Sequence, residues 1–179
     1  MEKAVLTKWA IDPMHSEIQF KIKHLVISTV TGKFKEFEGA LEQEGESFEN
    51  ATVEFSAKID SIETGVADRD AHLKSDDFFN AEKYPELKFK GTRFIKLDNN
   101  NYKLNGDLTI RDITKEIDLD VFYGGTVTDP YGQTKAGFEI SGEINRKDYN
   151  LKWSAVTEAG SVVVSDQVKL NLNVQLVRN

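Results

Sequence analysis

The sequence contains no cysteine in its 179 residues, so disulfides, thiolate metal sites, iron–sulfur clusters and cysteine nucleophiles are all excluded. It also lacks any apolar run that approaches the roughly 20 residues of a membrane-spanning helix. The first ten residues do not follow the charged, then apolar, then small layout of a signal peptide. We therefore expect a cytoplasmic protein.

The sequence is also short of positive charge. Lys and Arg together number 23 against 30 Asp and Glu, which gives a net charge of -7, and the acidic residues form no block. Such a chain has no general attraction for nucleic acids or anionic lipid surfaces, so neither is an expected partner. At about 100–200 residues per domain, residues 1–179 are expected to form a single domain.

The dominant pattern is the alternation of apolar and polar residues, which is typical of strands with one buried and one solvated face. The alternating segments, one of which changes phase between Phe34 and Phe37, are 17–24, 32–42, 53–60, 87–89, 102–110, 117–123, 136–144 and 168–176. The phase change indicates a bulge. Eight long antiparallel strands with short connections favour an up-and-down barrel, with a packed two-sheet sandwich as the alternative.

One segment, residues 64–84, interrupts the alternation between the third and fourth strands. Residues 68–73 predict a short helix. Ser75 is predicted to cap the N-terminus of a second helical turn, with Asp76 and Asp77 favourable to its dipole. Pro85 ends this excursion before the next strand. The predicted fold is thus all-β, an eight-stranded antiparallel barrel with one short helical excursion.

The residues that most often carry chemistry form no recognisable site. His15, His24 and His72 lack the close spacing of a zinc motif, so no metal site is predicted. No Gly-x-Ser-x-Gly elbow is present. Asp12, His15 and Ser16 are close in sequence, but a triad is a spatial arrangement, and a hydrogen-bonded turn is the favoured interpretation. Nothing in the residues themselves specifies an enzyme.

The chain has eleven phenylalanines, several of which alternate with polar residues and so belong to the inward face of the barrel. Small residues interrupt it at Gly39, Ala57, Gly106, Ala136 and Gly142. An eight-stranded barrel can be filled by side chains or can hold one small ligand, and inward glycines fit either case. An apolar cavity would require a long-chain guest, because burying ten methylenes contributes about 8 kcal/mol before ordering costs. Its polar end would lie at the mouth.

A series of spaced motifs runs through nearly the whole chain. They are Trp9-x-x-Asp12-x-x-His15-Ser16-x-x-x-Phe20-x-x-x-His24-Leu25, Gly32-x-Phe34, Ser61-Ile62-x-Thr64, Arg69-Asp70-x-His72-Leu73-x-Ser75-x-x-Phe78-Phe79, Tyr84-Pro85 with Phe89 after it, Gly106-x-Leu108-Thr109-Ile110, Arg146-x-Asp148-Tyr149, and the closing strand from Val168. In this order they resemble the YceI-like family. One departure is Asn150, where the family often carries glycine.

The resemblance implies a lipocalin-like barrel with an elongated apolar cavity. Family members bind polyisoprenoids, isoprenoid quinones or related long-chain amphiphiles and often form homodimers. We therefore expect a non-enzymatic carrier or storage protein with a bound isoprenoid or acyl lipid and no other cofactor. The residues expected to line its cavity are Ile18, Phe20, Ile22, His24, Phe55, Ile59, Phe89, Leu104, Leu108, Phe138 and Ile140. Phe78 and Phe79 are expected to form a lid over one end.

Two interpretations of the helical excursion remain open. Arg69 and His72 could contact a phosphate or quinone head group. Alternatively, Arg69 and Asp70 could brace the helix against the barrel. Two other functions also remain open: an enzyme that acts on an isoprenoid lipid with His15 or His72 as acid or base, and an interaction or stress protein with a packed core.

Overall fold

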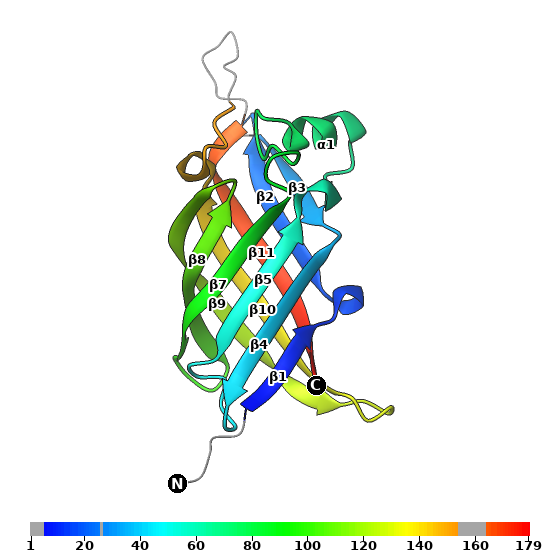
Figure 1. Ribbon diagram of the computed structural model, residues 1–179, viewed down its shortest axis with the longest axis vertical. Coiled ribbons are helices and arrows are strands. Elements are labelled where there is room, and N and C mark those ends of the chain that lie inside the picture. The colour runs from blue at the N-terminus through cyan, green and yellow to red at the C-terminus, as the bar shows by residue number, and fades with distance from the viewer. Residues whose placement is uncertain (1–5, 26, 154–163) are drawn as a thin grey trace.

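The computed structural model describes residues 6–25, 27–153 and 164–179. Strands dominate it (Figure 1). They are β1 (Leu6–Ile11), β2 (Glu17–His24), β3 (Ser28–Phe34), β4 (Phe37–Glu44), β5 (Thr52–Lys58), β6 (Ile62–Glu63), β7 (Glu86–Lys96), β8 (Asn101–Ile110), β9 (Ile113–Thr128), β10 (Thr134–Asn145) and β11 (Val164–Arg178). The helices are α1 (Ala67–Lys74) and the 3-10 turns η1 (Pro13–His15), η2 (Ile59–Ser61) and η3 (Arg146–Tyr149).

The strands close into a barrel. Antiparallel pairs run in the order β1-β4-β5-β7-β8-β9-β10-β11, and β11 returns to β1 with Trp9 opposite Arg178. The closed ring satisfies the backbone hydrogen bonds of both edges, which an open sheet would leave exposed. The predicted eight-stranded antiparallel barrel is confirmed.

Two positions of the ring are each shared by two short strands. β11 pairs with β1 near its C-terminal end, where Ile11 is opposite Leu176, and with β2 farther back, where Ile22 is opposite Val168. β3 and β4 likewise occupy one position of the ring, one after the other. The break between them falls at the exposed residues 35–36, which separate the buried rings of Phe34 and Phe37. The phase change in the sequence therefore marks this break, whereas β1 has no clear alternation and was not predicted as a separate strand.

The inward glycines mostly make room for neighbouring side chains. A Cβ atom on Gly106 would lie 2.6 Å from the Cζ of Phe89, and one on Gly142 would lie 2.4 Å from a methyl group of Leu119. Both distances are well below any normal contact, so these neighbours already occupy the space. Gly106 and Gly142 thus allow close packing and do not themselves enlarge the interior.

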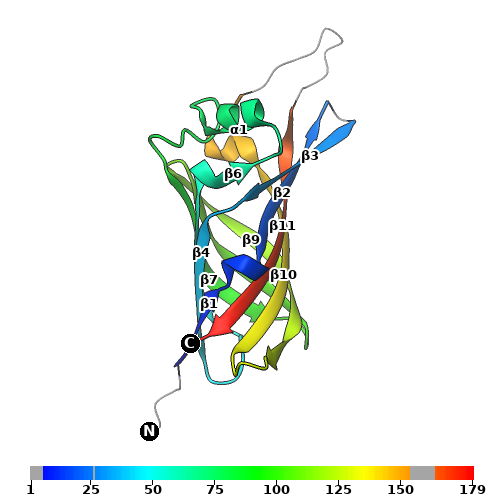
Figure 2. The same cartoon turned by 90° about the vertical axis from the view of Figure 1, so that its right-hand side faces the viewer.

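The helical excursion covers one end of the barrel (Figure 2). Helix α1 contains the predicted helical residues 68–73. A turn does follow Ser75, whose carbonyl oxygen accepts the N–H of Phe78 at 3.1 Å, but it is not helical and the Ser75 side chain does not cap it. Ser75 instead ends α1: its backbone N–H and its hydroxyl both donate to the carbonyl oxygen of His72. Residues 76–79 and 81–83 form turns. Within the described ranges, no helix is long and apolar enough to cross a membrane.

Arg111, in the turn between β8 and β9, fastens the excursion to the barrel. Its Nη1 donates to the carbonyl oxygens of Asp76 (2.9 Å) and Phe78 (2.8 Å). Its Nη2 lies 2.8 Å from the Asp76 carboxylate, and its side chain is only 14% exposed. Arg111 therefore links the turn that follows α1 to the barrel, a role for which Arg69 and Asp70 were one of two open interpretations.

Candidate ligand-binding cavity

The barrel encloses a cavity of about 360 Å³. Packed interiors contain few voids larger than a water molecule, which needs only about 10–15 Å³ by the same kind of measure. The volume falls within the roughly 300–1,000 Å³ that small-molecule sites occupy. The interior is thus a candidate binding site and not an imperfection of packing.

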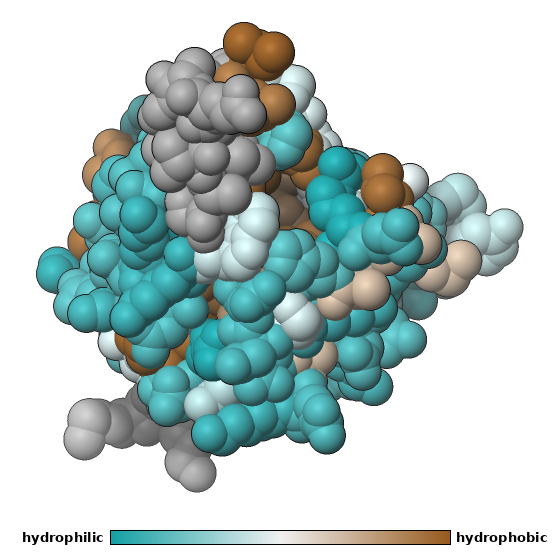
Figure 3. Space-filling view, turned by 90° about the horizontal axis from the view of Figure 1, so that it is seen from above, coloured by the Kyte–Doolittle hydropathy of each residue, from teal (hydrophilic) through white to brown (hydrophobic). Residues whose placement is uncertain are grey.

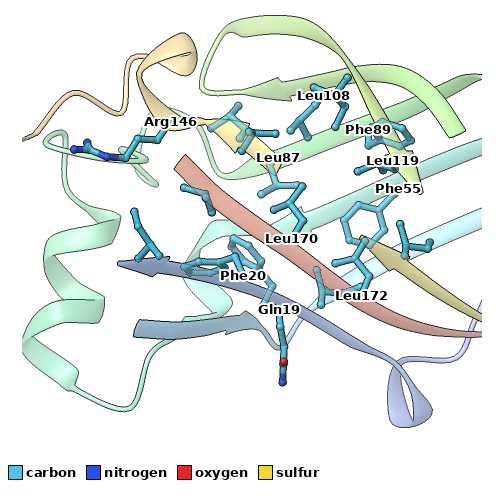
Figure 4. A pocket seen from close by; sticks show the side chains of 18 of the residues that line it. Gln19, Phe20, Phe55, Leu87, Phe89, Leu108, Leu119, Arg146, Leu170 and Leu172 are labelled. Carbon is cyan, nitrogen blue, oxygen red and sulfur yellow. The ribbon is translucent and has the colours of Figure 1, made fainter. Parts of the chain in front are cut away.

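Alternation along the strands determines the wall. Side chains at every second position face inward, and Figure 4 shows Phe20, Phe55 and Leu170 pointing into the cavity while Gln19 turns away. Every residue predicted to line the cavity or cover its end, apart from Ile59, lies on this wall: Ile18, Phe20, Ile22, His24, Phe55, Phe78, Phe79, Phe89, Leu104, Leu108, Phe138 and Ile140.

Ile59 lies elsewhere because strand β5 ends one residue before it. The chain enters the 3-10 turn η2 at Ile59, and its backbone N–H donates to the carbonyl oxygen of Pro85 at 2.9 Å. The side chain is 2% exposed and packs in the core. Extending the alternation past Lys58 therefore placed Ile59 wrongly.

Other wall residues were missing from the prediction. One set is the inward row of β11, which alternates in the sequence and could have been included: Val168, Leu170, Leu172, Val174 and Leu176. Arg146 and Trp153 also line the cavity, but they lie outside the strands. No periodic pattern could have identified these two residues.

The cavity is polar at the end beneath α1. The polar residues that line this end come from the end of β2, from the excursion and from η3: Lys23, His24, Thr64, Arg69, His72 and Arg146. Seen from above, hydrophobic side chains are visible in a hollow among hydrophilic ones at this end of the molecule (Figure 3). An apolar interior with polar groups at one end matches the two parts of an amphiphile.

Arg69 and Asp70 organise the start of α1. Arg69 donates from Nε to the hydroxyl of Thr64 (2.7 Å) and from Nη2 to its carbonyl oxygen (2.6 Å). The carboxylate of Asp70 accepts the backbone N–H of Thr64 at 2.8 Å. These contacts support the bracing interpretation, although the brace acts within the excursion.

His72 belongs to an aromatic cluster beneath α1. Its ring packs edge-on against Trp153, with centroids 4.9 Å apart, and against Phe78 at 5.1 Å. Its Nε2 lies 2.8 Å from the Asp77 carboxylate. Phe79 makes a similar edge contact with Phe34 in β3 at 6.2 Å. Phe78 and Phe79 thus line the cavity from the helical excursion.

Arg146 supports the same end of the wall from within. Its guanidinium is 2% exposed. It donates to the carbonyl oxygens of Ser165 (2.8 Å), Trp153 (2.7 Å), Val164 (3.3 Å) and Leu151. Burial lowers the pKa of the Arg146 guanidinium, and the charge of Asp166 opposes that shift. Because these carbonyls use its donors, Arg146 fixes the chain around η3 more readily than it could bind a ligand anion.

The group around His15 forms a turn outside the cavity. Asp12 accepts the backbone N–H of Met14 at 3.0 Å, and its carboxylate lies 2.7 Å from the His15 ring. The hydrogen bond with His15 is the main reason that the pKa of Asp12 is lowered. The Ser16 hydroxyl accepts the N–H of Gln175 at 2.9 Å. This geometry supports the turn interpretation. In the part of the chain that the structure describes, no group of three or more His, Asp or Glu side chains could hold a metal ion.

Comparison with known proteins agrees with this architecture. The YceI-like domain family matches residues 9–176. A UPF0312 protein of Photorhabdus laumondii is 42% identical over 142 residues, which cover 79% of this chain and 73% of the relative. The crystal structure of a Campylobacter jejuni YceI protein superposes with a TM-score of 0.72 at 34% identity, covering 88% of this chain and 90% of that one.

A structure described as a polyisoprenoid binding domain from Saccharophagus degradans, implicated in plant cell wall breakdown, shares the fold. Its TM-score is 0.71 at 14% identity, with 96% of this chain and 98% of that chain covered. The family match spans nearly the whole barrel, including the wall strands. The chain belongs to the YceI-like family.

Proposed function

We propose that this protein binds a long-chain isoprenoid, or a related acyl amphiphile, inside the barrel and acts as a carrier or storage protein. The observation that carries the proposal is the apolar cavity of about 360 Å³. Membership of the YceI-like family supports it, as does the polyisoprenoid-binding description of the Saccharophagus degradans domain. A packed interaction protein would not need such a volume.

The ligand is proposed to lie with its tail along the barrel and its polar end beneath α1. The wall supplies aliphatic and aromatic contacts over most of its length, whereas Lys23, His24 and Arg69 gather at one end. A phosphate, a quinone or a hydroxyl could each meet these groups. Of the two histidines that the enzyme interpretation would use, His72 lines the cavity and His15 does not.

Native mass spectrometry of the freshly purified full chain, followed by solvent extraction, tests the proposal. A discrete added mass that resolves to a prenyl or acyl chain is expected. If the protein is bare, a polyprenyl phosphate and an isoprenoid quinone are added back in turn. Failure of the chain to take up either compound would contradict the proposal and favour the interaction function.

We also propose that the protein forms a homodimer, as the family resemblance implies. The same native spectra give the oligomeric state directly. A mass of one chain at all concentrations would contradict the dimer without affecting the proposal about the cavity.

A further inference from the structure

Four aromatic side chains meet at the end of the barrel opposite α1, and they are named here the aromatic plug: Trp9 of β1, Phe48 of the loop between β4 and β5, Tyr123 of β9 and Phe138 of β10. Phe48 is at the centre. Its ring centroid lies 5.2 Å from that of Phe138, 5.3 Å from Tyr123 and 5.7 Å from Trp9. Such edge and tilted contacts are favourable aromatic geometries.

The plug has an inner side and an outer side. Phe138 lies on the cavity wall, whereas Phe48, which packs edge-on against it, and Trp9, which packs against Phe48, do not line the cavity. Phe48 is 6% exposed although it comes from a loop. The loop is held in place, because the backbone N–H of Asn50 donates to the carbonyl oxygen of Phe94 at 2.8 Å. Trp9 is fixed in turn by a hydrogen bond from its Nε1 to Gln43.

We propose that the aromatic plug sets the length of chain that the barrel can hold. The inference rests on the proposed function, since it concerns the tail of the same ligand. The end of the ligand tail contacts the ring of Phe138. Phe48 packs against the other side of that ring and prevents it from moving away from the tail. Carbon atoms beyond this length remain near the mouth beneath α1, where they gain less from burial.

This arrangement predicts a break in a series of ligands of increasing length. Each methylene that enters the cavity raises the affinity about fourfold. Once the tail reaches Phe138, further carbons add little, and the affinity stops rising. A cavity open at both ends would show no such break at this position, because the chain could emerge past β1 and β9.

The experiment measures the affinity of the full chain for all-trans polyprenols from geraniol to solanesol, by competition with a fluorescent fatty acid. Phe48→Leu removes part of the support behind Phe138 and should move the break to longer chains. Phe138→Trp narrows the inner side and should move it to shorter ones. Phe37→Leu is the matched control: Phe37 is 8% exposed, packs on Phe55 and belongs to neither the cavity wall nor the plug.

Opposite shifts in the two plug variants, with no shift in Phe37→Leu, are the expected result. Phe138→Trp keeps an aromatic ring in the plug, so it provides a second test if Phe48→Leu fails to fold. If the wild type binds polyprenols and every folded variant breaks at the same chain length, the plug does not set the length, although the proposed function stands. If the wild type binds no member of the series, polyprenol binding as proposed is wrong, and so is the inference that the aromatic plug sets the chain length.

Discussion

Replacing Gly106 with alanine tests how the interior of the barrel is filled. The new Cβ atom would lie 2.4 Å from the carbonyl oxygen of Lys90 and 2.6 Å from the Phe89 ring. The carbonyl is part of the neighbouring strand and cannot move aside cheaply. Overpacking of this kind costs about 1–3 kcal/mol. Alanine recovers about 0.5–1 kcal/mol of the conformational cost of glycine in a strand, so the middle of these ranges leaves a net loss of about 1 kcal/mol.

Gly137→Ala provides the matched control in the same barrel. A Cβ atom on Gly137 would meet nothing within 4 Å, so this variant should be as stable as the wild type or up to about 1 kcal/mol more stable. Urea unfolding at constant slope measures both changes in the free energy of unfolding. Equal stabilities of Gly106→Ala and Gly137→Ala would mean that Gly106 borders open space and would contradict the close packing described here.

Three further variants test other parts of the structure. Gly32→Ala places a Cβ atom 2.2 Å from the tip of the Phe20 ring and should push that ring into the cavity, which lowers ligand affinity in the competition assay with little loss of stability. Arg111→Met removes the anchor of the excursion and should cost about 1–3 kcal/mol while speeding hydrogen exchange in residues 76–84; unchanged exchange there would contradict the role of Arg111. Burial raises the pKa of Tyr149 to about 12. The folded state therefore holds the Tyr149 proton more tightly than the unfolded chain, whose tyrosine pKa is about 10, so stability is full below pH 10 and falls by about 2 kcal/mol as the pH rises toward 12. Tyr149→Phe should lack this alkaline loss in pH-dependent unfolding, and parallel curves for the two proteins would show that the Tyr149 proton is not involved.

The wall of the cavity could be predicted because inward positions repeat every second residue. Phe20, Leu104 and Phe138 are on different strands, and the period alone places each on the inward face, whereas the cavity that they line was implied by the resemblance to the YceI-like family. The pattern fails where a strand ends, as it does before Ile59, or where short strands share one position, as with β1 and β2.

Contacts between distant residues could not be predicted in this way. Arg111 bonds to Asp76, which is 35 positions away, and neither residue belongs to a periodic pattern that includes the other. Arg146 is identified as a support only by the carbonyl oxygens that converge on it. The size of the cavity is the difference between the volume that the barrel encloses and the volume of its side chains. Glycine positions alone do not reveal it, because the space beside Gly106 is already filled by the ring of Phe89.

The two tryptophans of the chain report on opposite ends of the proposed site, since Trp9 belongs to the aromatic plug and Trp153 lines the cavity beside His72. The most direct measurement is fluorescence quenching by an isoprenoid quinone in the single-tryptophan variants Trp9→Phe and Trp153→Phe. Because the quinone ring quenches at short range, we expect saturable quenching of Trp153 and little quenching of Trp9. Preferential quenching of Trp9, or no saturable quenching of either residue, would contradict a ligand bound with its polar end beneath α1.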